Sequence, residues 1–368
     1  MKPLQKVVAC LCLGLLCACA AAAQSYTVTD LGTLSGFSSS LAYDISPSGL
    51  VVGCSDNSTP PSTPCSTTIP AEAYLWTLKG GMQPLGYLSG FDVSVAYVAN
   101  DSGTVVGYAG DSQSGNAHGF VWTQGGGMVD LGTLTGSTGW SEAAAITSKG
   151  VIVGSSYISK GGNDQDDAVL WTGSGKSYQI HDEGVLPGFP HVYPNDINEK
   201  QLVTGVACQD TNCKNPYHAF LWSKAKPWID LPLLPGGKFS DGEWMNTSGV
   251  IAGWSSSPKY PNGVSVYWDT NRKIHSIGTL PGGTSSFPGF ITDSGEILGE
   301  STVPSGDNHA YIWTKKKKRM QDLNNMIPKN SGWDLHHAAA IDNAGHIVGY
   351  GTINGVDHAY LLTPKARR

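Results

Sequence analysis

Residues 128–171 decide the fold, and they read MVDLGTLTGSTGWSEAAAITSKGVIVGSSYISKGGNDQDDAVLW. The stretch holds three apolar pieces in a fixed order, DLGTLTG, AAAITSKGVIVG and AVLW. Each piece recurs six more times along the chain, with steps of about 46 to 54 residues between copies of the first. A fixed internal period is typical of repeat architectures. The sequence therefore predicts one short unit that is copied seven times.

The repeated unit has the pattern of four antiparallel strands. AAAITSKGVIVG is an apolar strand, a turn of small polar residues with a glycine, and a second apolar strand, which is a β-hairpin. Only the fourth copy lacks the turn glycine and has Gln201 there. The piece AVLW is a third strand, and a short turn leads from it into a fourth strand that ends in the DLG piece. Because the second strands are apolar on both sides, both faces of each sheet should be covered.

Sheets that are covered on both faces can stack around an axis as a β-propeller. The chain begins with a lone fourth-type strand at residues 26–31 and ends after a third-type strand at residues 358–362. The N-terminal strand can therefore complete the last blade and close the ring. We predict an all-β fold, a seven-bladed β-propeller of four-stranded antiparallel blades, as a single domain over residues 24–368. A one-way solenoid is the alternative, and it would need distinct polar caps.

The N-terminus has the order of an export signal. MKPLQK is followed by an apolar run at residues 7–23 and then by Gln24, with small residues before it. We predict a signal peptide at residues 1–23 that is cleaved before Gln24. A degenerate lipoprotein box leaves a lipid anchor at Cys19 as the alternative. The run is short for a transmembrane helix, so we expect no membrane span and a location outside the cell or in the bacterial cell envelope.

The mature chain is acidic. Without Lys2 and Lys6 it has 21 basic and 29 acidic residues, a net charge of −8. This charge argues against a nucleic-acid partner and against an anionic membrane surface.

Four cysteines lie outside the predicted signal, and an even number in an exported chain indicates disulfides. The close pairs are Cys54 with Cys65 and Cys208 with Cys213. Each pair lies within one inter-strand connection, so local pairing needs no distant contact. Zinc is the alternative, but neither pair has the spacing or the histidine partner of a structural zinc site.

The repeated strings DLGTLxG, AxxINxxGxIVG and HAFLW resemble the HAF-repeat family of probable extracellular bacterial proteins. The resemblance covers essentially the whole mature chain. It implies export and repetition, without a defined activity. Two places depart from the pattern, Leu362 where other copies have tryptophan and the DLNNMIP segment from Asp322.

The side chains that repeat with the unit are expected to be structural. His118, His218, His309 and His358 share one place before the third strand. Equivalent places in a ring are far apart, and we expect no repeated ligand partner within a unit, so we predict a hydrogen bond to a neighbouring turn and no metal site. The tryptophan that ends the third strand should pack between blades. The aspartate of the DLG piece should accept backbone hydrogen bonds at the turn that follows.

The loops that vary are the better place for a binding site. Connections from fourth to first strands and from second to third strands emerge at the same end of a propeller, and here both are long. The aromatic and histidine residues expected on this long-loop face are Phe37, Phe91, Trp140, Phe189, His191, Tyr193, Phe239, Trp244, Phe287, Trp333, His336 and His337. The candidate ligand-binding residues are Trp140, Glu142, Phe189, Tyr193, Trp244, Trp333, Asp334 and His336.

Trp140 and Trp333 stand out among these candidates because each lies in a longer, glycine-flanked insertion and has a nearby carboxylate. Exposed aromatic rings beside carboxylates suit stacking on sugars or anchoring a peptide. The alternative is that these rings pack loop on loop or plug the channel mouth.

These patterns favour an exported binding or scaffold module for a glycan or an extracellular protein, with no cofactor and no assigned catalytic residue. One alternative is a glycan-active hydrolase or lyase that uses channel-facing carboxylates. Its candidates are Glu142, Asp196, Asp241, Glu243 and Asp334. A purely structural surface protein is the second alternative. The acidic run Asp164, Asp166 and Asp167 lacks the spacing of a calcium loop, so we expect a solvated loop there.

Overall fold

The computed structural model describes residues 25–58, 65, 69–136 and 139–366. It is an all-β fold, as predicted, with one short 3-10 helix, η1 (Leu323–Asn325), in the described part of the chain. The predicted signal peptide at residues 1–23, its cleavage before Gln24 and the alternative anchor at Cys19 lie outside the described residues. Among the helical residues that are described, none forms a helix long and apolar enough to cross a membrane.

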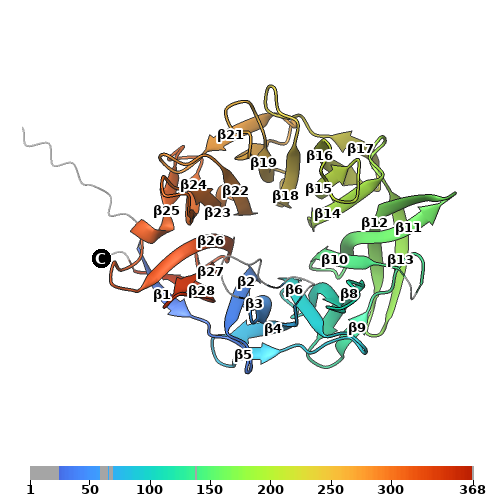
Figure 1. The fold of residues 1–368 in the computed structure, drawn as a ribbon, viewed down its shortest axis with the longest axis horizontal. Coiled ribbons are helices and arrows are strands. Elements are labelled where there is room, and N and C mark those ends of the chain that lie inside the picture. The colour runs from blue at the N-terminus through green and yellow to red at the C-terminus, as the bar shows by residue number, and fades with distance from the viewer. Residues whose placement is uncertain (1–24, 59–64, 66–68, 137–138, 367–368) are drawn as a thin grey trace, which may run out of the picture.

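The strands pair in groups of four that follow chain order, and we number these groups as units (Figure 1). Unit one holds β2 (Ser39–Ile45), β3 (Val51–Asp56), β4 (Ala71–Thr77) and β5 (Gly81–Pro84). Unit two holds β6 (Val93–Ala99), β7 (Val105–Gly110), β8 (Ala117–Thr123) and β9 (Gly127–Asp130). Unit three holds β10 (Ser141–Ile146), β11 (Ile152–Lys160), β12 (Asn163–Ser174) and β13 (Ser177–Gly184). Unit four holds β14 (His191–Ile197), β15 (Val203–Cys208), β16 (Tyr217–Ser223) and β17 (Lys226–Asp230).

The remaining units have the same antiparallel order. Unit five holds β18 (Ser240–Met245), β19 (Ile251–Ser255), β20 (Val264–Trp268) and β21 (Ile274–Gly278). Unit six holds β22 (Ser286–Ile291), β23 (Glu296–Thr302), β24 (Asn308–Thr314) and β25 (Met320–Asp322). Unit seven holds β26 (Trp333–Ile341), β27 (Ile347–Ile353), β28 (Val356–Pro364) and, from the other end of the chain, β1 (Tyr26–Asp30). Single parallel bridges join β4 to β6 and β12 to β14, so units one and two, and units three and four, share a sheet.

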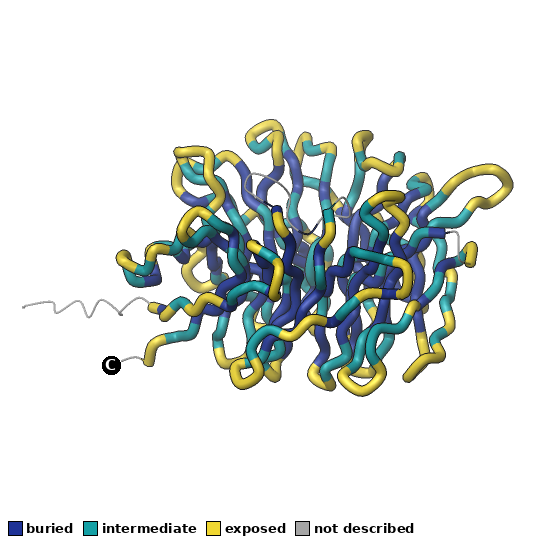
Figure 2. The backbone as a smooth tube through the Cα atoms, turned by 60° about the horizontal axis from the view of Figure 1, so that its bottom comes forward, coloured by how far each residue is buried: buried dark blue, intermediate teal, exposed yellow. Residues whose placement is uncertain are grey.

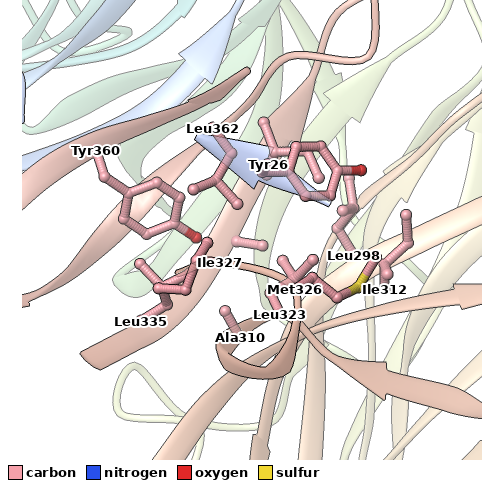
Figure 3. Packing of buried hydrophobic residues seen from close by; sticks show 12 residues of the cluster. Tyr26, Leu298, Ala310, Ile312, Leu323, Met326, Ile327, Leu335, Tyr360 and Leu362 are labelled. Atoms are coloured by element: carbon pink, nitrogen blue, oxygen red, sulfur yellow. The ribbon is translucent and has the colours of Figure 1, made fainter. Parts of the chain in front are cut away.

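The N-terminal strand pairs with the C-terminal strand, as the sequence predicts. β1 and β28 are antiparallel, with Tyr26 opposite Pro364 and Asp30 opposite Tyr360. Figure 3 shows Tyr26 and Leu362 among buried side chains of units six and seven, such as Leu298. This pairing and burial fix the two ends of the described chain to each other.

The units follow one another around a common centre, with the first strand of each unit innermost (Figure 1). β18 lies across this centre from β2 and β6. Figure 2 shows that buried residues occupy the middle of the body and that exposed residues concentrate at its two ends. The inner strands are therefore the elements that can form the wall of a central channel.

Each sheet packs on both faces, which explains the apolar strands. In β16, Phe220 and Trp222 belong to one buried cluster, whereas Ala219 and Leu221 belong to another on the opposite face. Most of the tryptophans that end third strands are buried, and Trp171 is fully so. The predicted structural role of these tryptophans is confirmed.

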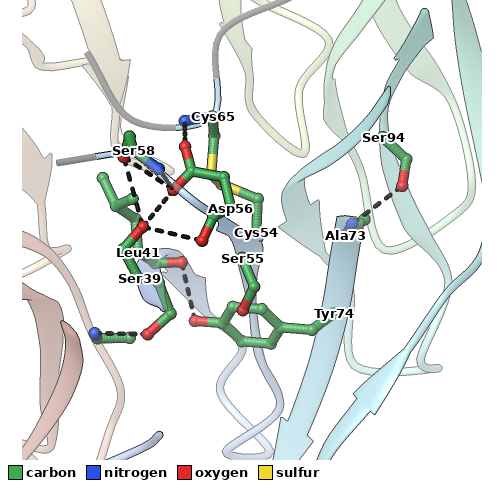
Figure 4. The surroundings of a disulfide bond; sticks show 12 residues. Ser39, Leu41, Cys54, Ser55, Asp56, Ser58, Cys65, Ala73, Tyr74 and Ser94 are labelled. Carbon is green, nitrogen blue, oxygen red and sulfur yellow. Dashed lines mark hydrogen bonds between the residues drawn. A yellow bond between two sulfur atoms is a disulfide. The ribbon is translucent and has the colours of Figure 1, made fainter. Parts of the chain in front are cut away.

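Both predicted disulfides are present, Cys54 with Cys65 and Cys208 with Cys213. Beside the Cys54–Cys65 disulfide, the Asp56 carboxylate accepts hydrogen bonds from the Cys65 backbone N–H at 2.6 Å and from the Ser58 hydroxyl at 2.8 Å (Figure 4). The disulfide and the buried carboxylate together hold Cys65 against the end of β3.

One predicted loop is a pair of strands instead. The polar stretch after GVIVG in unit three continues as β11 and β12, which turn at Gly161 and Gly162. Cross-strand pairing extends to Lys160 opposite Asn163. Its polar residues suggested a loop, but ladder hydrogen bonds between the two strands keep it extended.

Candidate functional site

A β-bulge interrupts the first strand of every unit at the same place. In unit one the pairing of β2 with β3 shifts between Ala42 and Asp44, which leaves Tyr43 as the extra residue. The glycine opposite the bulge, Gly53, has no room for a side chain, because a Cβ atom there would lie closer than 3.0 Å to the Leu41 carbonyl oxygen. The same close approach recurs at the glycine that ends the second-strand piece of every unit. The repeated glycine therefore exists to accommodate the bulge.

The bulges place one extra residue per unit toward the centre. We call these residues the bulge ring, and they are Tyr43, Tyr97, Ala144, Asn195, Glu243, Gly289 and Ala339. All of them line one cavity of about 460 Å³. Residues two positions earlier in their strands add Glu142, Tyr193, Phe287 and His337 to its wall. The cavity is thus built by the first strand of each unit.

Glu142 lies among tyrosines on one side of this cavity. Burial raises its pKa, although a hydrogen bond with Tyr97 partly opposes this. Burial is also the main cause that raises the pKa values of Tyr97, Tyr108 and Tyr193, and the charge of Glu142 adds to it in each case. Glu142 is therefore a carboxyl group surrounded by aromatic rings.

A second acidic group comes from β18, where Asp241 and Glu243 flank Gly242. The Asn195 amide donates to Asp241 Oδ1 at 2.9 Å. Burial raises the pKa of both carboxyl groups, and repulsion by Asp241 raises that of Glu243 further. Two buried carboxyls that repel each other hold a proton more readily than either would in water.

His337 is the one ionisable nitrogen side chain in the cavity wall formed by the described residues. Its Nδ1 lies 3.2 Å from Glu300 Oε2, and its ring stacks on Tyr350 with centroids 5.3 Å apart. No lysine or arginine lines the cavity within the described part of the chain. The wall is therefore acidic and aromatic.

A second cavity, of about 320 Å³, lies at the end with the hairpin turns and includes Asp44 and Asp196. Asp44 Oδ2 accepts the Ala99 N–H at 3.1 Å, and Asp196 Oδ2 accepts the Met245 N–H at 2.7 Å. Burial raises the pKa of each carboxyl to about 7, against the opposing effect of these bonds. Asp196, expected among the channel-facing carboxylates, thus ties its unit to the next one.

The structure brings some of the predicted site residues together. Glu142, Tyr193 and Trp244 all line the larger cavity. Trp140 is partly buried next to them, with its ring centroid 6.3 Å from that of Tyr193. The predicted exposure of Trp140 on the loop face is wrong in part, because its ring packs against neighbouring units.

The other predicted residues lie elsewhere. Phe189 packs against His218, with centroids 5.1 Å apart. Trp333 packs on Tyr360, with centroids 6.0 Å apart. Asp334 is exposed, and it lies 3.7 Å from the Nε2 atoms of both His309 and His336. Of these predicted residues, Phe189, Trp333, Asp334 and His336 are not in the cavity wall.

Sequence reasoning missed most of the bulge ring, including Tyr43, Tyr97 and Asn195. The available signal was a variable residue inside an otherwise repeated apolar strand, two positions after Leu41, Val95 or Tyr193. A strand pattern alone does not reveal a bulge, so it gives no indication that these residues face a cavity.

The acidic run of unit three is not a solvated loop, which corrects the expectation for that segment. Asp166 is buried and accepts the Tyr193 hydroxyl at 2.7 Å, and its Oδ2 lies 2.8 Å from His191 Nδ1. Asp167 is fully buried and pairs with Lys160. The two side chains point into the fold because their strand, β12, is extended there.

The repeated histidines have a repeated partner, contrary to the expectation of none. Nδ1 of His118 lies 2.9 Å from Asp130, the aspartate of the DLG piece in the same unit. His218, His309 and His358 lie at 2.9, 2.9 and 3.0 Å from Asp230, Asp322 and Asp30. The predicted backbone contact of the aspartate also forms, for example from Gly132 N–H to Asp130 at 2.7 Å.

The pairs bridge the third and fourth strands, which is a structural role. Where the histidine is replaced, the contact between the two positions changes. In unit three Asp167 replaces the histidine, and Lys160 lies between it and the aspartate Asp182. In unit five Val264 replaces the histidine and Ser276 replaces the aspartate. Among the described residues no group of three histidine, cysteine, aspartate or glutamate side chains is arranged to hold a metal ion.

No protein-family model matches the chain, and no curated protein is significantly similar to it. Solved structures resemble it in fold. A puromycin hydrolase aligns with a TM-score of 0.58 at 11% identity, over 88% of this chain and 51% of that one. Virginiamycin B lyase from Staphylococcus aureus aligns with a TM-score of 0.52 at 11% identity, over 92% and 99%. A prolyl endopeptidase aligns with a TM-score of 0.54 at 9% identity, over 93% and 51%.

This chain spans about half the length of the puromycin hydrolase and the prolyl endopeptidase. At identities this low the likeness shows the fold alone, an all-β arrangement of several propeller-like sheets.

Proposed function

We propose that this protein is an exported, closed seven-bladed β-propeller of the HAF-repeat type, and that it is a binding module. The pairing of β1 with β28 supports closure of the ring by the N-terminal strand. The two disulfides are in line with an extracellular location. The export signal at residues 1–23 completes this proposal.

The single observation that carries the binding function is the cavity of about 460 Å³. Its wall takes residues from the first strands of all units, and its size is within the range of small-ligand pockets. Aromatic faces such as Tyr193 and Trp244 can stack on a sugar ring, while Glu142, Asn195 and Glu243 can hydrogen-bond hydroxyl groups. A saccharide that enters the channel is the ligand that these groups suit best.

The experiment is a glycan array probed with the mature, oxidised protein. Trp244→Ala should weaken binding of any saccharide hit by about tenfold or more, because a stacking face is lost from the cavity. Trp333→Ala is the matched control, since it removes the same ring outside the cavity wall. If Trp333→Ala abolishes binding while Trp244→Ala does not, the ligand sits on the loop surface instead.

A second function, cleavage of a glycosidic bond, is favoured by the carboxyl pair of β18. Asp241 and Glu243 repel each other, so one of them can hold the proton that a general acid needs while the other is ionised. The saccharides that bind on the array are incubated with the protein, and the release of new reducing ends from them would support glycosidic cleavage. Unchanged release by Asp241→Asn and by Glu243→Gln would reject the role of the pair.

A further inference from the structure

The acidic groups of the cavity wall restrict the ligand, and this inference deepens the proposed binding function on which it rests. Glu142 and Glu243 both line the cavity, with Asp241 and Glu300 next to its wall. His337 is the only wall residue among those described that can carry a positive charge, and Glu300 lies 3.2 Å from it. A ligand that carries an anionic group would meet no free cation there.

The aromatic residues are placed around one of these acids. Tyr97 from β6, Tyr193 from β14 and Glu142 line the same cavity, and burial together with the charge of Glu142 raises the pKa of both tyrosines. Tyr43 extends the same aromatic wall, with its ring centroid 5.7 Å from that of Tyr97 in an edge-to-face contact. Rings that surround a carboxylate are the arrangement with which proteins bind substituted ammonium groups.

The shape of the bulge ring leaves room for such a group. Ala144, Gly289 and Ala339 are small, so the space between the tyrosines and Glu243 is not filled by side chains of the other units. Glu243 comes from β18, which lies across the centre from the strands of Tyr43 and Tyr97 (Figure 1). A ligand could therefore contact aromatic rings on one side and a second acid on the other.

We propose that the cavity binds the protonated amine or quaternary ammonium group of its ligand, held by Glu142 and the faces of Tyr97 and Tyr193. In a saccharide, the group is the free amine of an amino sugar. The same chemistry could come from a ligand that is not a sugar, such as one with a choline head group.

The test compares ligands of equal shape that differ in charge, by calorimetric titration of the oxidised protein. Choline is paired with its neutral isostere, in which carbon replaces the quaternary nitrogen, and glucosamine is paired with glucose, in which a hydroxyl replaces the ammonium group, at pH 6. We expect the cation of each pair that binds to bind at least about tenfold more tightly than its neutral partner. Tighter binding of glucosamine than of choline identifies a sugar as the carrier, and the reverse order identifies a ligand that is not a sugar.

Glu142→Gln should abolish this preference, because the amide keeps the shape of the side chain but cannot carry the negative charge. Asp164→Asn is the control, because it removes one negative charge from an exposed residue that is not among the described residues of the cavity wall. If Glu142→Gln does not fold, the affinities of the wild-type protein for choline and for its neutral isostere still decide whether the cavity binds an ammonium group.

Equal affinity for charged and neutral partners would overturn the ammonium site and leave the saccharide site standing if the array gives hits that Trp244→Ala loses. Absence of binding by choline, glucosamine and every saccharide on the array would overturn both.

Discussion

Opposite each bulge all units carry glycine, whereas at the bulge itself they carry Tyr, Ala, Asn, Glu or Gly. The two positions face each other across the same pair of strands, so the same fold imposes different demands on them. The glycine is in contact with a backbone carbonyl and tolerates no side chain. The bulge residue projects into a cavity, where packing does not select it. A residue that is the same in all units therefore supports the shared fold, which we call the frame. A residue that varies at a fixed backbone position marks a place where the protein can select a ligand.

The largest effect should come from adding one methyl group to the frame. In Gly253→Ala the new Cβ would overlap the Asp241 carbonyl oxygen and the Trp268 ring. Because neither backbone nor a fully buried ring can move freely, we expect a loss of about 3 kcal/mol in the free energy of unfolding, measured by urea denaturation. Gly125→Ala, in an open turn, is the control and should change it little. Similar losses in both variants would remove the steric account of the repeated glycine.

A pH-dependent effect of about 2 kcal/mol should come from Asp196, which follows the bulge by one residue. Its pKa is raised by burial to about 7 in the folded state, above the ordinary value of 3.8. The contribution of this carboxyl to stability is therefore complete below pH 3.8 and is lost as the pH rises through about 7. Asp196→Asn cannot ionise, so at pH 8 it should be more stable than the wild type by about 2 kcal/mol after the loss of a hydrogen bond.

Urea titrations of both proteins between pH 4 and pH 8 measure this difference. Val98 occupies the equivalent place in unit two, which shows that the fold does not require an acid there. If the two proteins kept the same stability difference at every pH, the carboxyl of Asp196 would not be the titrating group.

The frame was predictable from sequence to a large extent, and the cavity much less. The repeats predicted the strands, both disulfides and the pairing of the two ends, because each depends on local pattern or on spacing. The bulge was hidden, since the close backbone approach of Gly53 to Leu41 that accompanies it is not encoded in a pattern of apolar residues. Trp333 was chosen as a variable aromatic residue, but it packs on Tyr360 because variation in a loop does not distinguish packing from binding.

The pairing of histidine with aspartate tests whether the frame consists of coupled positions. Hydrogen bonding to Asp130 raises the pKa of His118, and the bond lowers that of Asp130 despite its burial. The histidine contribution is complete below pH 6.5 and is lost as the pH rises through its raised pKa. The aspartate contribution is present above pH 3.8 and is lost as the pH falls through its lowered pKa. The pair should therefore contribute most between about pH 4 and pH 6.5.

Asp130→Ser should cost about 1 kcal/mol at pH 6, because it leaves a buried imidazole without its partner, while solvent screens the half-exposed carboxylate. The double variant with His118→Val copies unit five, which has Val264 and Ser276 in these places, and should recover part of the loss. A double-mutant cycle measures the coupling, which should be smaller at pH 8. Additive losses would mean that the two positions vary independently.

The smallest effect concerns the one unit whose hairpin turn lacks the repeated glycine. Gln201 has a φ of 56°, in the left-handed region where other units have glycine, such as Gly150 with a φ of 81°. The turn is otherwise the same, since the N–H of Gln201 donates to the carbonyl oxygen of Asn198 at 2.8 Å and that of Gly150 donates to the carbonyl oxygen of Thr147 at 3.0 Å.

A residue with a side chain loses about 1 to 2 kcal/mol of stability when it adopts this left-handed conformation. Glycine avoids that cost, but its more flexible unfolded chain offsets about 0.5 to 1 kcal/mol of the gain. Gln201→Gly should therefore raise the free energy of unfolding by about 0.5 kcal/mol, and the reciprocal Gly150→Gln, which meets open space, should lower it by a similar amount. If Gln201→Gly instead weakened the protein, the glutamine side chain would be stabilising this turn, and the frame would tolerate variation where the backbone alone was expected to decide.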